Sequence, residues 1–329
     1  MFRVVRQGPR ALGTDGPPGT TGSLVIDTIG CVGGVLIRVH AVSVNRSDWE
    51  SLTARPVYVR LGGSGFLRPK RPILGSDIAG TVQAVGSDVT EFKPGDEVLV
   101  DSMWHGLGGF AEYVSVPERA PLVLKPGDVS FDQAASLPQA AVLALQGLRY
   151  KREPKPGDKV LISGAGGGAG SFAIQLAKAH GAEVTGVDST IKLDTMRDLG
   201  ADRVVDYTRE RLTGGDHRYD RILDFASNRS IFAHRRLLAP GGIYAMVGGS
   251  MPRILQTAAL GPLISKRGKV QMGVLVAKPN KEDLSYLAGL VASGELTPAI
   301  DRHYELREVP AALTYLGEGH ALGKIVIKI

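Results

Sequence analysis

The stretch that most constrains the fold is KVLISGAGGGAGSFAIQLAK, which runs from Lys159 to Lys178. It begins with a short apolar run typical of a buried strand and ends with apolar residues at the spacing of an amphipathic helix. Between the two, residues 164–170 are only glycine and alanine. A poorly placed glycine costs folding roughly 0.5–1 kcal/mol. So many glycines at one turn therefore indicate that a ligand approaches the backbone, although a tight turn without a ligand is the alternative.

Strand and helix patterns alternate from Pro156 onward. Helical patterns at residues 171–180, 191–199 and 230–238 separate strand-like segments. The strand-like segments are KVLIS, AEVTGVD, RVVDY, YDRILDFA and GGIYAMVG. This alternation predicts an α/β fold with a doubly wound parallel sheet of the Rossmann type. Just before it, residues 130–148 have helical spacing, with Ser130 as a candidate N-cap.

The first 120 residues or so are rich in short strand patterns bounded by turn residues, which favours a barrel-like β domain. The chain ends with a helical pattern near residues 281–293 and a last strand, GKIVIKI. That strand has no partner in the α/β unit, so we expect it to return to the first domain. The sequence thus predicts two domains, residues 1–127 with 273–329 and residues 128–272.

Composition limits the classes of partner and compartment. The chain has 329 residues, a formal net charge of +6 and one cysteine, Cys31, so neither an internal disulfide nor a cysteine-rich metal site can form. A cytoplasmic location is the simple expectation. No apolar run is long enough to span a membrane. The basic segment 57–72 lacks the aromatic interleaving of a nucleic-acid module, so we expect a solvated loop and no nucleic-acid partner.

The glycine turn fits a dinucleotide-binding fingerprint, G-x-G-x-x-G, with Ala165 at the first glycine position and Gly167 and Gly170 at the other two. Gly167 would let the backbone approach a diphosphate, and Gly170 would let the helix pack close to the strand. The free N–H groups at the start of that helix would face the phosphates. We predict that the whole turn contacts the cofactor: Gly164, Ala165, Gly166, Gly167, Gly168, Ala169 and Gly170.

An acid follows at the expected distance. Asp188 ends the strand AEVTGVD, where a carboxylate would bond both ribose hydroxyls of NAD and would repel the 2′-phosphate of NADP. The neighbouring Ser189, Thr190 and Lys192 would instead favour such a phosphate. A helix N-cap is the alternative role for Asp188. Asp224, in YDRILDFA, is expected to be a strand-end residue rather than a ligand.

Several motifs in this order resemble one known family. They are PILGSDIAGTVQAVGSDVTEFKPGDEV, GGFAEYV, ASLPQAAVLALQGL, the glycine turn with its flanks, LGADRVVDY and YDRILDFA. Together they are similar to the medium-chain dehydrogenase/reductase superfamily, in its zinc-free quinone-oxidoreductase-like branch, from about residue 30 to the end. The resemblance implies a GroES-like catalytic domain built from both chain ends around a Rossmann domain. It also implies NADPH or NADH in the cleft between them, a homodimer, and hydride transfer to quinones or α,β-unsaturated carbonyls.

Zinc members of this superfamily use a cysteine, a histidine–glutamate pair and a further ligand. This sequence has Asn45 at the cysteine position and Gly75-Ser76-Asp77 where Gly-His-Glu would stand. A zinc site needs three or four converging ligands. Asp77 and His105 alone do not supply them, so we expect no zinc.

Without a metal, hydrogen-bond donors must stabilise the oxyanion that forms as hydride arrives. Asn45 is the first candidate, as a donor to the substrate or to the cofactor ribose, with a capping role in the turn as its alternative. Tyr58 is a weaker candidate proton donor, since a phenol has a pKa of roughly 10; a packing residue under a loop is its alternative. Trp49 and Trp104 would line a flat aromatic pocket or belong to the core.

Other cofactor contacts are implied by the resemblance alone. Tyr207 corresponds to a residue near the adenine, Gly248 and Gly249 to the loop beside the nicotinamide, and Lys324 to a residue near the cofactor. Leu143 departs from the threonine that is common in relatives. The family default favours NADPH slightly, whereas Asp188 weakens that preference. A zinc-free alcohol/ketone oxidoreductase and a cofactor-binding scaffold or redox sensor without turnover are the alternative functions.

Overall fold

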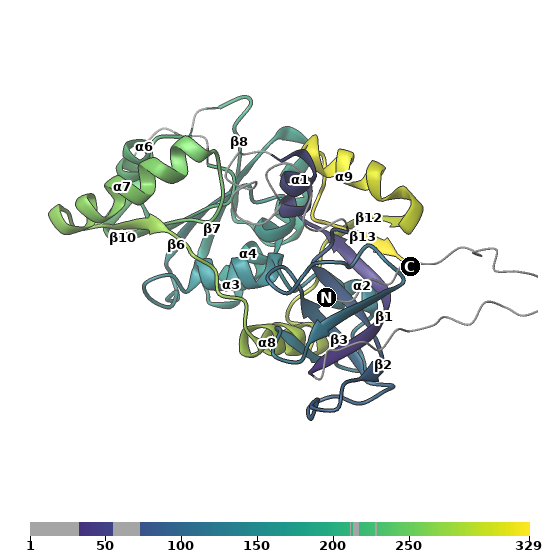
Figure 1. The fold of residues 1–329 in the computed structure, drawn as a ribbon. Helices are drawn as coiled ribbons and strands as arrows, with labels where there is room; N and C mark the ends of the chain where they lie inside the picture. The colour runs from purple at the N-terminus through teal and green to yellow at the C-terminus, as the bar shows by residue number, and fades with distance from the viewer. Residues whose placement is uncertain (1–32, 55–72, 211, 213–216, 228) are drawn as a thin grey trace, which may run out of the picture.

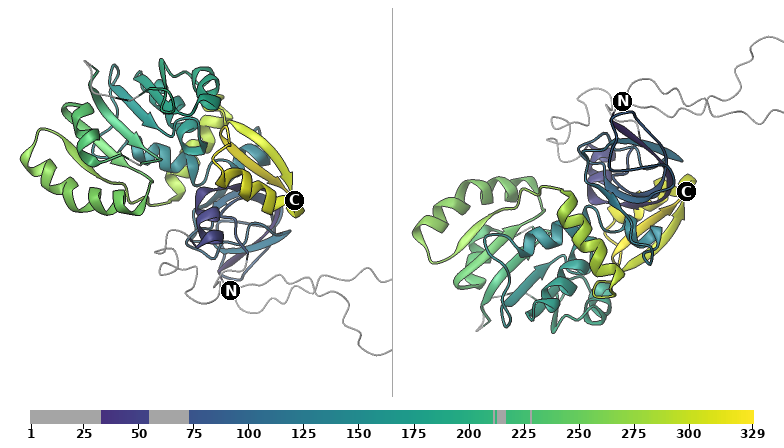
Figure 2. Two further views of the ribbon diagram at one scale, coloured as in Figure 1. Left: turned by 90° about the horizontal axis from the view of Figure 1, so that it is seen from above. Right: turned by 90° about the horizontal axis from the view of Figure 1, so that it is seen from below.

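The chain forms two lobes, each built around its own β-sheet (Figures 1 and 2). A cleft lies between them. The computed structural model describes residues 33–54, 73–210, 212, 217–227 and 229–329. Cys31, Tyr58 and the whole basic segment 57–72 lie outside these residues.

The first lobe holds a seven-stranded sheet in the order β12-β13-β1-β2-β3-β5, with β4 also paired to β1. Its strands are β1 (Gly34–Val44), β2 (Asp77–Val85), β3 (Glu97–Asp101), β4 (Tyr113–Pro117), β5 (Leu122–Leu124), β12 (Ile300–Glu305) and β13 (Lys324–Lys328). The last strand, β13, pairs antiparallel with β1, and Ile325 lies opposite Val44. The prediction that the end of the chain returns to the first domain is thus confirmed, and Figure 2 shows β13 and β12 against the first lobe.

The second lobe holds a six-stranded sheet in the order β11-β10-β9-β6-β7-β8, in which every pairing is parallel. Its strands are β6 (Lys159–Ser163), β7 (Glu183–Asp188), β8 (Arg203–Asp206), β9 (Tyr219–Asp224), β10 (Leu238–Met246) and β11 (Gln271–Val274). This is the predicted doubly wound sheet. The strand order reverses between β6 and β9, and ligands of such sheets bind at that point, outside the carboxyl ends of the strands.

Helices cover both sheets. They are α1 (Arg46–Thr53), α2 (Phe131–Ala135), α3 (Ala140–Leu148), α4 (Gly168–Ala179), α5 (Leu193–Asp198), α6 (Ile231–Leu237), α7 (Met251–Arg267), α8 (Lys281–Ala292) and α9 (Val309–Gly317), with short 3₁₀ turns η2 (Thr190–Lys192) and η3 (Leu306–Glu308). Ser130 is the N-cap of α2, as predicted, because its side chain accepts a hydrogen bond from the N–H of Gln133. The helical pattern of residues 130–148 forms two helices rather than one, since Pro138 disfavours helical backbone at the residue before it.

Sequence patterns missed α1, β5, α7, β11, β12 and α9. The helix α7 exposes the apolar residues Leu255 and Leu263 and contains Pro262, so its pattern lacks a clean apolar stripe. The helix α4 begins at Gly168, three residues before the predicted start. The glycines 168 and 170 therefore belong to its first turn.

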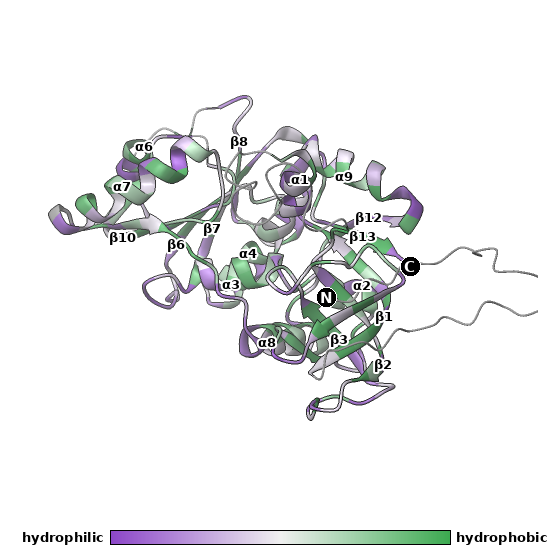
Figure 3. Cartoon of the chain, viewed as in Figure 1, coloured by the Kyte–Doolittle hydropathy of each residue, from purple (hydrophilic) through white to green (hydrophobic). Residues whose placement is uncertain are grey.

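The two lobes share part of their core. One hydrophobic cluster joins Leu99 and Val123 of the first sheet to Leu145 in α3, Phe172 in α4 and Leu287 in α8. Figure 3 shows the apolar strands inside both lobes and hydrophilic residues on the outer helix faces. This shared core fixes the positions of the two walls that face each other across the cleft.

Candidate active site

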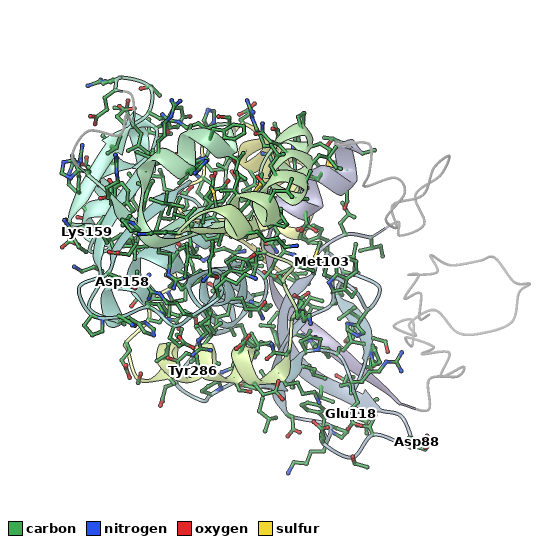
Figure 4. All side chains as sticks on the ribbon, turned by 90° about the vertical axis from the view of Figure 1, so that its left-hand side faces the viewer. Asp88, Met103, Glu118, Asp158, Lys159 and Tyr286 are labelled. Carbon is green, nitrogen blue, oxygen red and sulfur yellow. The ribbon has the colours of Figure 1, made fainter. Side chains whose placement is uncertain are left out.

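A cleft of about 1800 Å³ separates the two lobes. One wall is formed by the carboxyl ends of β6, β7, β9 and β10, and includes Gly164, Asp188 and Gly248. The opposite wall includes residues of α1 and the end of β3, among them Trp49 and Asp101. Met103 also lines the cleft, and Figure 4 shows it between the lobes, well away from Asp88 at the far end of the first lobe. The cleft thus lies where the sheet topology places a ligand.

The glycine turn forms the floor of this cleft. Gly164 has a φ of +78°, a left-handed conformation that favours glycine. A Cβ on Gly170 would lie 2.6 Å from the Cα of Ala165, so only glycine fits there. Among the described residues, the nearest atom to a Cβ on Gly167 would be the carbonyl oxygen of Gly164, at 3.5 Å. The fold therefore requires glycine at 170 but leaves open space at 167, on the side that faces the cleft.

The start of α4 offers free hydrogen-bond donors at the same place. Gly167 is its N-cap, and the first intrahelical bond runs from the N–H of Ser171 to the carbonyl of Gly167, at 2.9 Å. The N–H groups of Gly168, Ala169 and Gly170 precede that bond and have no intrahelical acceptor. Together with the positive end of the helix dipole, they form an anion site suited to a diphosphate.

Not every predicted residue of the turn faces the cleft. Gly164, Gly167, Gly168, Ala169 and Gly170 line it, whereas Ala165 is fully buried beneath them. Gly166 supports the turn from below: its N–H donates to Oδ2 of Asp188 at 3.0 Å. Ala165 and Gly166 thus shape the turn rather than form the wall.

At one end of the cleft, near the carboxyl end of β7, lies Asp188. Its carboxylate accepts hydrogen bonds from the N–H groups of Gly166 and Ser189, and Nζ of Lys192 lies 3.7 Å from its Oδ1. Asp188, Ser189, Lys192 and Tyr207 all line the cleft. The N-cap of η2 is Ser189, so the alternative role of Asp188 as a helix cap is not the observed one.

Thr190 lies apart from the other predicted cofactor contacts in this segment. Its hydroxyl donates to Oδ2 of Asp206, and it does not belong to the cleft wall. The hydroxyl instead holds η2 against the end of β8. The expectation that Thr190 binds a 2′-phosphate has no support in this geometry.

At the other end, beneath the cleft, lies a buried ionic cluster that we call the Lys324 cluster: Lys324, Asp77, Asp48 and Asp101. Nζ of Lys324 donates to Oδ1 of Asn45 at 2.6 Å and lies 3.5 Å from Oδ2 of Asp77. Burial lowers the pKa of Lys324, while Asp77 and the other two carboxylates oppose that shift. A Cβ on Gly168 would lie 3.0 Å from Cδ of Lys324, so the cluster abuts the start of α4.

Two carboxyls of this cluster have raised pKa values. Burial raises the pKa of Asp48 to about 7, against the hydrogen bonds that it accepts from the N–H groups of Asn45 and Gly75. Burial and the neighbouring charge of Asp77 raise the pKa of Asp101 to about 7. The cluster therefore holds protons near neutral pH.

Asn45 is the N-cap of α1 and is buried. Its side-chain oxygen accepts from Lys324, its amide nitrogen lies 3.5 Å from Oγ of Ser76, and it is not part of the cleft wall. Its predicted role as a donor to substrate or cofactor stays a prediction. The observed contacts are those of a residue that fixes the ammonium of Lys324.

The residues around Asn45 also decide whether a zinc ion would fit at this site. An amide at Asn45, a hydroxyl at Ser76 and the ammonium of Lys324 stand together here, and an ammonium has no lone pair to donate. Across the part of the chain that the structure describes, no group of three histidine, cysteine, aspartate or glutamate side chains is arranged to hold a metal. The donor set at this site does not fit zinc.

Sequence reasoning missed two pairs of residues on the cleft walls. In the first pair, the hydroxyl of Ser47 donates to Oε1 of Gln139 at 3.0 Å, which joins α1 to the start of α3. Nothing in the local pattern marks these two residues, because they are distant from each other in sequence.

The second pair is Asp224 and His234. Oδ2 of Asp224 accepts from the hydroxyl of Tyr244 at 3.0 Å and lies 3.1 Å from Nε2 of His234. Burial opposes ionisation of Asp224, but the hydrogen bonds from His234, Ser227 and Tyr244 hold its pKa below the ordinary value. Asp224 is a strand-end residue as expected, yet it also lines the cleft. Its place at the carboxyl end of a central strand was the signal that sequence reasoning could have used.

The remaining predicted positions also reach the cleft. Gly248, Gly249, Leu143, Trp49 and Trp104 line it. Trp49 packs against α9, since a Cβ on Gly317 would clash with its ring, while Trp104 is 66% exposed. Lys324 lies just below the wall and contacts it through Gly168.

Comparisons with known proteins agree with this architecture. Residues 32–127 match the model of an alcohol dehydrogenase GroES-like domain, and residues 199–327 match that of a zinc-binding dehydrogenase. The chain is 33% identical to a chloroplastic quinone-oxidoreductase of Triphysaria versicolor, over 90% of each chain. It is 34% identical to a chloroplastic NADPH-dependent alkenal/one oxidoreductase of Arabidopsis thaliana, over 89% of this chain and 71% of the other. Among solved structures, the quinone oxidoreductase from Coxiella burnetii superposes with a TM-score of 0.79, at 32% identity and 91% coverage of both chains.

Proposed function

The chain belongs to the medium-chain dehydrogenase/reductase superfamily, in its quinone-oxidoreductase-like branch, and from that premise we propose that it reduces quinones or α,β-unsaturated carbonyls with NAD(P)H. The observation that carries the proposal is the open space above Gly167. Gly167 faces the cleft, and the packing of the described residues does not require glycine at that position. Three N–H groups without an intrahelical acceptor lie beside it, at the start of α4. A cofactor diphosphate accounts for both features.

The remaining cofactor contacts follow from the direction of the cleft. Asp188, Ser189, Lys192 and Tyr207 would hold the adenosine half at the ends of β7 and β8. Gly248 and Gly249, at the end of β10, would lie beside the nicotinamide. The nicotinamide supplies a hydride to the substrate carbon when it is bound.

The chain itself orients the substrate and excludes water. Leu143, Val247 and Leu275 give the cleft an apolar lining on the Rossmann side. Trp49 and Trp104 face them from the other lobe and suit a flat conjugated substrate. In such a low-dielectric site, donors aimed at the developing oxyanion have a larger effect than in water.

We also propose a preference for NADPH over NADH. Asp188 would repel a 2′-phosphate if its carboxylate were free, but it already accepts two backbone N–H donors and faces Lys192. Lys192 and Ser189 both line the cleft at that point and would contact the phosphate. The relative from Arabidopsis thaliana is named as NADPH-dependent, which favours the same choice.

Three further properties remain predictions from the sequence and the family: a cytoplasmic location, a homodimer, and the domain division at residues 127/128 and 272/273. Within the described segments no helix is both long and apolar enough to cross a membrane. The relatives from Triphysaria versicolor and Arabidopsis thaliana are both chloroplastic proteins. The strand β11 ends at Val274, two residues beyond the second proposed boundary.

The test combines turnover with binding. The purified chain should oxidise NADPH, followed by its absorbance, in the presence of 9,10-phenanthrenequinone or 2-cyclohexenone. NADPH should also raise the melting temperature more than NADH does at equal concentration, since tighter binding to the folded state stabilises it more. No oxidation with either acceptor, although NADPH binds, would contradict the proposed reduction and favour a cofactor-binding scaffold.

A further inference from the structure

Asp101 is a buried carboxyl on the cleft wall that the proposed function has not yet used. It is the last residue of β3, lies opposite Asp77 across the β2–β3 pair, and is only 2% exposed. Its Oδ1 accepts a hydrogen bond from the N–H of Met103 at 2.9 Å. Its Oδ2 is buried and has no hydrogen-bond partner among the described residues. An unpartnered carboxyl oxygen in such a place indicates a neutral acid or a missing ligand atom.

The surroundings of Asp101 favour the neutral acid. The groups that face it are Asp77 on β2, Asp48 on α1 and Lys324 on β13, so three carboxyls share one lysine. Asp77 is the carboxyl nearest to the lysine, and Asp48 accepts two backbone N–H donors. Asp101 has a single donor, from Met103, so its ionised form is poorly stabilised and burial raises its pKa.

The contacts also place Asp101 beside the substrate region. The N–H of Gln139, at the start of α3, donates to Oδ2 of Asp77, and the Gln139 side chain lies 2.8 Å from Sδ of Met103. Gln139, Met103 and Asp101 all line the cleft. The start of α3 thus contacts the end of β2 and the segment after β3, and all three places border the cleft or its Asp77 support.

Reduction of a conjugated carbonyl needs a proton as well as a hydride. We propose that Asp101 is the acid that supplies this proton, an inference that rests on the proposed reductase function. The hydride adds with its electron pair to the β-carbon of the enone, and the C=C π electrons move to form an enolate. The O–H bond of the Asp101 carboxyl then breaks, its proton bonds to the enolate, and the electron pair stays on the carboxylate. A water proton restores the acid for the next turnover.

Asp101→Asn is the variant that tests the proposal, because it keeps the shape of the side chain but removes the acidic proton. With NADPH and 2-cyclohexenone or 9,10-phenanthrenequinone, whichever the wild type reduces, we expect kcat to fall about 100-fold or more. Wild-type kcat should decline as pH rises through about 7, because the acid is needed protonated and burial raises its pKa to about 7. The variant should lack this decline. The matched control is Asp88→Asn, at an exposed carboxyl far from the cleft (Figure 4), which should behave like the wild type.

A second readout does not depend on turnover. A carboxyl whose folded-state pKa is raised binds more protons in the folded state, so the stability of the wild type should decrease as pH rises from about 4 to about 7. Asp101→Asn cannot ionise at this position, so it should lose less stability than the wild type as pH rises. It should therefore melt at a higher temperature than the wild type at pH 8. A lower kcat together with a higher melting temperature is not what a merely structural residue would show.

The possible failures are distinct. If the wild type binds NADPH but reduces neither acceptor, the proposed function fails and this inference fails with it. If the wild type turns over and Asp101→Asn keeps kcat within threefold with the same pH dependence, only the role of Asp101 is overturned. If the variant does not fold, the wild-type profile decides, because a kcat that is flat from pH 5.5 to 9 would exclude an acid of this kind.

Discussion

Each end of the cleft has a buried aspartate facing a lysine, but the two pairs are built differently. At the nucleotide end, Asp188 and Lys192 are four residues apart and are brought together by the short turn η2. In the Lys324 cluster, Asp77 on β2 faces Lys324 on β13, which lies 324 − 77 = 247 residues further along the chain of 329. One pair results from local backbone geometry, and the other exists only because the last strand returns to the first sheet.

The difference also appears in how well each carboxylate is satisfied. Asp188 accepts two backbone N–H donors besides its contact with Lys192. The Lys324 cluster has three carboxyls for one ammonium, and two of them have pKa values raised to about 7. Asp188 is therefore fully satisfied by its own neighbours, whereas the Lys324 cluster has more carboxyls than its one ammonium can compensate.

The largest expected effect is on stability, from Lys324→Met. Removing one partner of a buried ion pair leaves uncompensated charge, so we expect a loss of about 3–5 kcal/mol in the free energy of unfolding at pH 8. The loss should be smaller at pH 5, because the buried carboxyls then take up protons in the folded state. Urea unfolding at both pH values measures it.

Lys192→Met is the matched control for that variant. Asp188 keeps its two backbone donors in Lys192→Met, so we expect a loss of only about 1–2 kcal/mol. Equal losses in the two variants would show that the local and the long-range pairs contribute equally to stability, contrary to this expectation.

The next effect separates cofactor binding from folding. In Gly167→Ala the new Cβ meets no protein atom nearer than 3.5 Å, so the melting temperature of the free protein should stay close to that of the wild type. The Cβ would occupy the space in which the diphosphate approaches, and we expect the Kd for NADPH to rise about 100-fold, or about 2.7 kcal/mol. Isothermal titration calorimetry measures the Kd.

Gly170→Ala, in the same turn, should affect the stability of the free protein rather than cofactor binding alone. Its Cβ would lie 2.6 Å from the Cα of Ala165, so folding itself should be impaired. If Gly167→Ala bound NADPH as tightly as the wild type does, the turn would not be the diphosphate site.

The smallest expected effect concerns the choice of cofactor. Lys192→Met should weaken NADPH binding about tenfold, or about 1.4 kcal/mol, because a charge-assisted hydrogen bond to the 2′-phosphate is lost. NADH binding should change much less. A parallel loss for both cofactors would mean that Lys192 supports the turn rather than reads the phosphate.

The sequence by itself determined the features that depend on neighbouring residues. Periodicity predicted β6, α4 and β7, and the composition of residues 164–170 predicted a backbone that a ligand approaches. Ser130 was recognisable as a cap because a capping bond spans only three residues. The motifs were specific enough to identify the superfamily, because they cover most of the chain.

Only the tertiary structure decided which of those residues face the cleft and which support it from behind. Ala165 and Gly166 turned inward, Thr190 bonded to Asp206 outside the cleft wall, Asn45 took the ammonium of Lys324, and Asp101 became part of a buried ionic cluster. The physical reason is that the burial of each side chain, and the charges beside it, depend on strands that meet in space but lie far apart along the chain. From the sequence alone, a carboxyl at the end of a strand is expected to have its ordinary pKa. The pKa of Asp101 is raised only because residues of β2, β13 and α1 surround it in the folded chain.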